Sequence, residues 1–155
     1  MGVGKTVVGK QVAATLNNLF LDLDELIEKS TNQTITNIFR TDGEKAFREL
    51  EFQALQSSIY LQDYVLSTGG GIVEFSDSYK LLQNSQQVVW LKASFDIIKK
   101  RLNDDDIQSR PLFDDTVLDR FNRRQEMYQN VANLTIEVDN LTIEEVAEKI
   151  INRYG

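Results

Sequence analysis

Met1-Gly2-Val3-Gly4-Lys5-Thr6 opens the chain and finishes in Gly-Lys-Thr, the ending of a phosphate-binding loop. A helical pattern follows directly over about residues 6–17, with apolar side chains on one stripe. In such a loop, backbone N–H groups at the helix N-terminus bind phosphates, the Lys reaches the terminal phosphates and the Thr hydroxyl holds Mg²⁺. The alternative is a flexible N-terminus that contains this pattern by chance.

The complete motif also needs a glycine five positions before Gly4 and a strand that leads into the loop. Both would lie upstream of Met1, so we expect the chain to begin inside the loop and to lack its first strand. In α/β folds with a phosphate-binding loop, the strand that leads into the loop lies in the centre of the sheet. Strands at about 64–66 and 88–91 are expected to flank it. The chain as written is therefore predicted to be less stable and less active than one extended by such a strand.

Strands and helices alternate along the rest of the chain. Short apolar runs suited to buried strands lie at about 19–21, 64–66, 88–91 and 134–138, and helical spacing covers about 44–61, 95–102, 117–131 and 143–154. This order predicts an α/β fold with a central parallel sheet and helices on both faces. Because no linker composition is visible, we expect residues 1–155 to form a single domain.

Composition excludes several classes of function. The 155 residues include 17 Lys and Arg against 24 Asp and Glu, a formal net charge of −7 that argues against nucleic-acid binding. Cys and His are absent, so acid–base chemistry must use carboxylates, Lys, Tyr or groups of the substrate. With no apolar stretch of about 18 residues and no visible signal peptide, we expect a cytoplasmic protein without a membrane partner. We also expect a monomer.

Two carboxylates, Asp22 and Asp24, follow the first apolar run. Strand alternation would point both to the same face, at the carboxyl end of the strand, where α/β sheets bind ligands. One could organise Mg²⁺ while the other accepts a hydroxyl proton. Alternatively, Asp24 caps a helix at about 25–30 and Asp22 is solvated.

Three consecutive glycines, Gly69-Gly70-Gly71, follow Thr68 at the end of the second apolar run. Glycines at such a place let a ligand approach the backbone and leave N–H groups free to bind an anion. A flexible turn is the alternative, although a turn rarely needs three glycines.

Three arginines are candidates for binding anionic groups. Arg48 and Arg124 lie in helical segments, where each taken singly is better read as a solvated residue or as the partner of a Glu in the same helix. Arg110 lies in a polar, acidic stretch at about 103–114, which suggests either a lid that closes over a nucleotide or a surface loop.

The order of these motifs resembles that of shikimate kinase. Along the chain they are Gly-x-Gly-Lys-Thr, Asp-x-Asp, Phe-Arg-Glu-x-Glu, Gly-Gly-Gly, Arg-Pro-Leu and Arg-x-x-x-Tyr. The likeness extends from Gly2 to about Ile151, and residues 39–49 and 68–71 are its most specific segments. It implies a P-loop NTPase fold of the nucleoside-monophosphate-kinase type. The implied activity is transfer of the ATP γ-phosphoryl group to the 3-hydroxyl of shikimate, within aromatic amino-acid biosynthesis.

The resemblance also implies roles for single residues. On the nucleotide side, ATP would contact Gly2, Val3, Gly4, Lys5, Thr6, Arg101 and Arg110, with Arg101 on the adenine side and Arg110 on the lid. Mg²⁺ would be held by Thr6 and, through water, by Asp22. The catalytic residues would be Asp24 as base, Lys5 and Arg110.

On the shikimate side, Asp24 would bind the hydroxyls, and Arg48, Arg124 and the backbone of Gly69–Gly71 would hold the carboxylate. Phe39 and Phe47 would wall the pocket. A pair of Arg with one Asp matches a ligand that has one carboxylate and three hydroxyls.

Two alternatives to this function stay open. A related small-molecule kinase, such as one for gluconate, would act on another polyhydroxy carboxylate. A kinase-derived protein could instead bind its ligand without turnover. The Phe-Arg-Glu segment together with the triple glycine favours shikimate.

Overall fold

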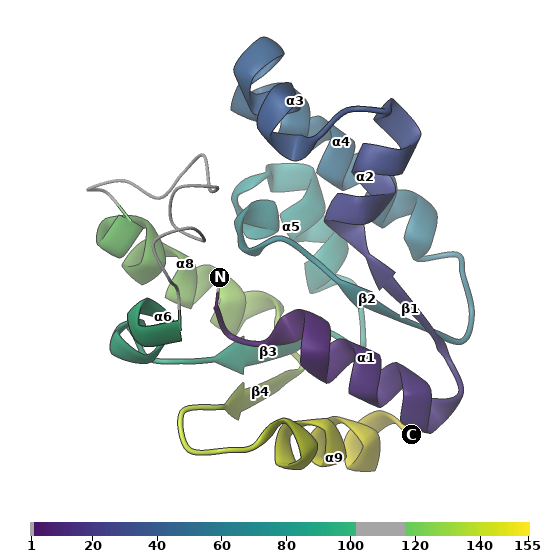
Figure 1. The fold of residues 1–155 in the computed structure, drawn as a ribbon, viewed down its shortest axis with the longest axis vertical. Coiled ribbons are helices and arrows are strands. Elements are labelled where there is room, and N and C mark those ends of the chain that lie inside the picture. Colours follow the sequence, from purple (N-terminus) through teal and green to yellow (C-terminus); the bar gives the residue numbers. More distant parts are fainter. Residues whose placement is uncertain (1, 102–116) are drawn as a thin grey trace.

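The computed structural model describes residues 2–101 and 117–155 (Figure 1). The predicted lid at 103–114, with Arg110, lies outside the described residues. In the first half of the chain the elements are α1 (Lys5–Leu16), β1 (Leu19–Asp22), α2 (Leu23–Thr31), α3 (Ile35–Thr41), α4 (Gly43–Ser58) and β2 (Tyr64–Ser67). They are followed by the 3₁₀ helix η1 (Gly70–Glu74), α5 (Ser76–Gln83), β3 (Val89–Lys92), α6 (Phe95–Arg101), α8 (Val117–Val131), β4 (Leu134–Glu137) and α9 (Ile143–Tyr154).

The strands pair in parallel, which confirms the predicted α/β class. β1 pairs with β2 from Leu19 opposite Tyr64 to Asp22 opposite Ser67. β3 pairs with β4 in the same orientation. β2 and β3, the strands predicted to flank the strand leading to the loop, do not pair with each other, so the described strands form two sheets instead of one.

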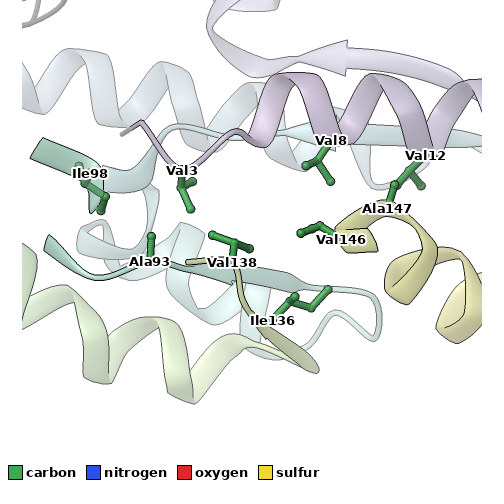
Figure 2. Close-up of a cluster of buried hydrophobic side chains, with 9 residues drawn as sticks. All are labelled: Val3, Val8, Val12, Ala93, Ile98, Ile136, Val138, Val146 and Ala147. Atoms are coloured by element: carbon green, nitrogen blue, oxygen red, sulfur yellow. The ribbon is translucent and has the colours of Figure 1, made fainter. Parts of the chain in front are cut away.

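One hydrophobic core joins the N-terminal loop to the C-terminal helix. Val8 and Val12 of α1 face Val146 and Ala147 of α9, and Val3 of the loop lies toward Ala93 and Val138 in the same cluster (Figure 2). Side chains from β4 and from the start of α6 complete this cluster. Burying each such valine contributes about 1.5–3 kcal/mol, so the loop is anchored through Val3 as well as through the helix it precedes.

A second core lies under the helices gathered at the opposite end of the molecule from α9 (Figure 1). Leu23 and Ile27 of α2 pack with Ile38 of α3 and with side chains of α4, and Ile72 of η1 belongs to the same cluster. This core therefore fixes α4 and η1 relative to the end of β1.

The sequence predicted most element positions to within a few residues, but it missed three helices. α3, α5 and η1 are short, and α3 begins with the β-branched residues Ile35 and Thr36, which have weak helix propensity. α3 is stabilised locally by Thr34, whose hydroxyl accepts a hydrogen bond from Asn37 N–H at 3.2 Å. The predicted helix at 44–61 ends earlier, at Ser58. Among the described residues, no helix is long and apolar enough to span a membrane.

Candidate active site

The glycine-rich loop leads into α1 through a left-handed residue. Gly4 is the N-cap of α1 with φ of +93°, a conformation that L side chains rarely adopt. Its carbonyl accepts the hydrogen bond from Val8 N–H at 3.0 Å that begins the helix. The first N–H groups of a helix have no partner within it and carry partial positive charge. Lys5 and Thr6 are the first two residues of α1, beside these N–H groups.

Asp22 and Asp24 occupy two different elements, which corrects the argument from strand alternation. Asp22 ends β1 and caps α2, accepting a hydrogen bond from Asp24 N–H at 3.1 Å. Asp24 lies in the first turn of α2, so the two carboxylates do not follow the twofold period of one strand. The alternative in which Asp24 caps the helix is also wrong, because Asp22 does so.

The Asp24 carboxyl is largely shielded from water. Its Oδ1 atom is buried and has no hydrogen-bond partner among the described residues. Burial raises the pKa of Asp24, and the neighbouring Asp22 raises it further, while Lys5 and Arg48 act in the opposite direction. A carboxylate in these surroundings can accept a hydrogen bond and a proton from a bound ligand.

The triple glycine lies against both the acidic and the basic side chains of this region. A Cβ on Gly69 would lie 2.7 Å from Glu51 Oε1 and 3.7 Å from Asp24 Oδ1. A Cβ on Gly71 would lie 2.5 Å from Arg48 Cζ. Side chains at these positions would displace the charged groups, so Gly69 and Gly71 are required by the close approach of Glu51 and Arg48. The predicted approach of a ligand to this backbone stays a prediction.

Arg48 is held by two carboxylates of its own helix. Its guanidinium donates to Glu44 Oε1 at 2.9 Å and to Glu51 Oε2. Burial lowers the pKa of Arg48, but the Glu51 and Glu44 carboxylates outweigh that effect and raise it overall. The Arg48 Nε and Glu51 Oε1 atoms are buried without a partner among the described residues. Sequence reasoning quoted Glu51 as part of a motif but gave it no role.

α8 brings a second set of polar side chains to the glycines. Arg120, Arg124 and Tyr128, spaced four apart, share one face of this helix. Tyr128 Oη donates to the Gly70 carbonyl at 2.7 Å, and a Cβ on Gly70 would lie 3.8 Å from Arg124 Nη1. Burial raises the pKa of Tyr128, so its hydroxyl remains a donor. Sequence reasoning assigned no role to Tyr128 or Arg120.

A cavity connects the phosphate-binding loop with this arginine face. Lys5, Gly69, Gly70, Arg120 and Arg124 belong to its lining, together with apolar side chains of β3, η1 and α8. The nucleotide side and the predicted carboxylate side of the site therefore open into one space.

The predicted aromatic wall lies beside the site. Phe39 of α3 and Phe47 of α4 pack with ring centroids 4.8 Å apart. The Arg48 guanidinium lies over the Phe47 ring, 5.3 Å from its centroid. Neither ring belongs to the lining of the cavity described above, and in this structure the Phe47 ring packs against Arg48.

Arg101, predicted on the adenine side, lies next to the glycine-rich loop. It lines a second cavity with Gly2, Gly4 and Val7, closed by the segment that precedes α9. Arg101 is exposed at the end of α6. The structure thus places Arg101 beside the phosphate-binding loop and outside the cavity that Arg124 and Gly69 line.

The described residues suit a magnesium ion that binds together with phosphates. Within residues 2–101 and 117–155, no group of three or more acidic side chains could hold a metal ion without other ligands. Mg²⁺ in kinases is commonly bound by one or two protein oxygens, with substrate phosphates and water completing its shell. The Thr6 hydroxyl and the Asp22 carboxylate fit this donor set.

A phosphate-binding helix start shares a cavity with arginines that face a glycine backbone, and a buried acid stands beside them. Together with the parallel α/β architecture, this arrangement defines a small-molecule kinase of the P-loop class.

Comparison with known proteins narrows the class. The family model for shikimate kinase matches residues 1–154, and the chain belongs to this family. It is 37% identical over 158 residues to a shikimate kinase of Dictyoglomus turgidum, covering 99% of this chain and 92% of that protein. A shikimate kinase of Staphylococcus aureus is 36% identical, with 98% of this chain and 88% of that protein covered.

Solved structures agree with the family assignment. A shikimate kinase from Acinetobacter baumannii in complex with shikimate superposes with a TM-score of 0.90 at 33% identity, covering 99% of this chain and 87% of that one. The shikimate kinase from Bacteroides thetaiotaomicron gives a TM-score of 0.85 at 29% identity, over 99% of this chain and 93% of that one. The predicted P-loop fold and the predicted family are thereby confirmed.

Proposed function

We propose that Asp24 is the general base of an ATP-dependent phosphorylation of the shikimate 3-hydroxyl. The acceptor oxygen bonds to the γ-phosphorus of ATP, the bond from that phosphorus to the β–γ bridging oxygen breaks, and ADP leaves with its electron pair. The hydroxyl proton passes to Asp24. Its buried, unpartnered Oδ1 and its raised pKa support this role, because a base works best when its pKa approaches the working pH.

The shikimate carboxylate binds between Arg48 and Arg124, against the backbone of Gly69–Gly71. The observation that carries this proposal is the convergence of both guanidinium groups on the triple glycine from two different helices. Two cations and a glycine backbone suit a carboxylate, and the Asp24 carboxyl next to Gly69 suits hydroxyls of the same ring. Catalysis then depends mainly on positioning the acceptor and neutralising charge.

ATP binds with its phosphates at the N-terminus of α1. Lys5 would reach the terminal phosphates, and Thr6 and, through water, Asp22 would hold Mg²⁺. Mg²⁺ would supply charge neutralisation on the transferred phosphoryl group. Arg101, which lines a cavity beside the loop, would contact the adenine side. The lid role of Arg110 stays a prediction, as do the single domain, the monomer and the cytoplasmic location.

A coupled assay of ADP formation with shikimate and gluconate side by side tests the function. Both acceptors are polyhydroxy carboxylates, so the comparison asks whether the site selects the ring of shikimate. We expect ADP release with shikimate and none above background with gluconate. Turnover of gluconate alone would assign a different kinase, and binding of shikimate without ADP release would assign a ligand-binding protein.

A further inference from the structure

The Arg124 guanidinium is held along one edge by Glu74, the last residue of η1. Arg124 Nε donates to Glu74 Oε2 at 3.0 Å, and Arg124 Nη2 donates to the same oxygen. The other carboxylate oxygen, Oε1, accepts from Arg123 Nη2. The Glu74 and Arg124 side chains are only 16% and 12% exposed, whereas Arg123 is 64% exposed.

The contact with Glu74 leaves the opposite end of Arg124 directed at the triple glycine. A guanidinium has five N–H donors in a fixed plane, so fixing the Nε–Nη2 edge also fixes the direction of Nη1. Nη1 is the atom that lies 3.8 Å from the position of a Cβ on Gly70. Glu74 and Gly70 belong to the same short helix, η1, and Tyr128 Oη ties α8 to it a second time.

The ion-pair cluster of Glu74, Arg123 and Arg124 carries a net positive charge. Arg123 and Arg124 carry two positive charges against the single negative charge of Glu74. Burial raises the pKa of Glu74, but the hydrogen bonds from Arg124 and Arg123 outweigh it and hold that pKa below its usual range. Glu74 is therefore ionised, and the cluster still attracts an anion.

We propose that Glu74 is a positioning residue, which orients Arg124 so that its Nη1 end binds the substrate carboxylate. The inference rests on the proposed role of Arg124 in binding shikimate. A carboxylate that competed with the substrate would occupy the Nη1–Nη2 end of the guanidinium. Glu74 instead occupies the Nε–Nη2 edge, from the side of η1.

The test compares Glu74→Gln with Glu126→Gln. Both changes remove one negative charge, and Glu126 is exposed on α8 with no ion pair to a described residue. Shikimate affinity without nucleotide is measured by calorimetry, together with the KM of each substrate, kcat and Tm. We expect Glu74→Gln to raise the shikimate Kd and KM about tenfold, with less than about a twofold change in kcat and in the ATP KM. Glu126→Gln should behave as wild type.

Two further variants separate positioning from a structural role. Glu74→Asp keeps the charge on a shorter side chain and should restore part of the affinity, and it provides a second measurement if the Gln variant folds poorly. In an Arg124→Ala background, Glu74→Gln should have no further effect on shikimate binding, because both changes act through one guanidinium.

Unchanged or tighter shikimate binding in Glu74→Gln would overturn this inference, and tighter binding would show a competing carboxylate. A parallel loss for ATP and shikimate with a lowered Tm, or additive effects with Arg124→Ala, would equally overturn it. A wild-type chain that neither binds nor phosphorylates shikimate would overturn the proposed function together with this inference.

Discussion

Arg48 and Glu51 form an ion pair one helical turn apart on α4, with side chains 8% and 1% exposed. Arg48 lies over the Phe47 ring and against Gly71, and Glu51 lies against Gly69, so the pair is buried beside the proposed shikimate site. Removing one partner of a buried pair leaves the other as an unpaired buried charge.

Arg48→Ala is therefore expected to destabilise the fold as well as to weaken shikimate binding. We expect the free energy of unfolding to fall by about 3–5 kcal/mol, measured by urea denaturation. Glu51→Gln in the same background should recover part of this loss, because it removes the unpaired charge. A double variant as unstable as the sum of the two single variants would contradict this account.

Asp24→Asn should abolish turnover far more than it weakens nucleotide binding. An amide keeps the shape of the side chain but cannot accept the hydroxyl proton, and a general base typically contributes about 10²–10⁴-fold. The measurement is kcat for shikimate phosphorylation beside ATP affinity in the absence of shikimate. An Asn variant that retained more than about half of the wild-type kcat would exclude Asp24 as the base.

In the pH profile of kcat/KM for shikimate, the acid limb should lie at a pH above the usual pKa range of an aspartate. Asp24 acts as a base only when ionised, and its raised pKa means that activity is lost as the pH falls through that raised value. Asp22→Asn removes a like charge, so the limb should move to lower pH, while Asn can still cap α2.

Glu28→Gln is the matched control for that shift. Glu28 also raises the pKa of Asp24, though less than Asp22 does, and Lys5 and Arg48 lower it. The Gln side chain keeps an acceptor for Ile35 N–H, which Glu28 binds at 2.8 Å. In Glu28→Gln we expect the acid limb to move to lower pH by less than it does in Asp22→Asn. A limb that stays in place or moves to higher pH in Asp22→Asn would show that Asp24 does not control it.

Arg101→Ala should raise the KM for ATP and leave that for shikimate unchanged. Arg101 lines the cavity beside the phosphate-binding loop, away from the cluster around Gly69–Gly71. Lys100→Ala, an exposed change of the same charge on the same helix, is the control. Initial rates at varied ATP and at varied shikimate give the two KM values for each variant. An equal rise of the ATP KM in Arg101→Ala and Lys100→Ala would mean that Arg101 acts only through its charge.

The sequence by itself determined the parallel α/β class and the helix that begins directly after Gly4. The start of the helix was predictable because it depends on local backbone conformation, and the left-handed Gly4 leads directly into it. The contacts of Gly69 with Glu51 and of Gly71 with Arg48 depend on the packing of α4 instead. The strands were predictable for a similar reason, since buried strands are short apolar runs.

Tertiary structure alone decided which charged groups from different elements meet. Strand alternation misplaced Asp24, because β1 ends at Asp22 and a helix begins at the next residue. The contact between Glu74 and Arg124 joins residues 50 positions apart, and it exists because α8 packs against η1. Local pattern specifies the conformation of a segment, and it also offers Arg48 its partners within α4. The partner of Arg124 depends instead on how distant segments pack, and that packing assigns Arg124 to Glu74.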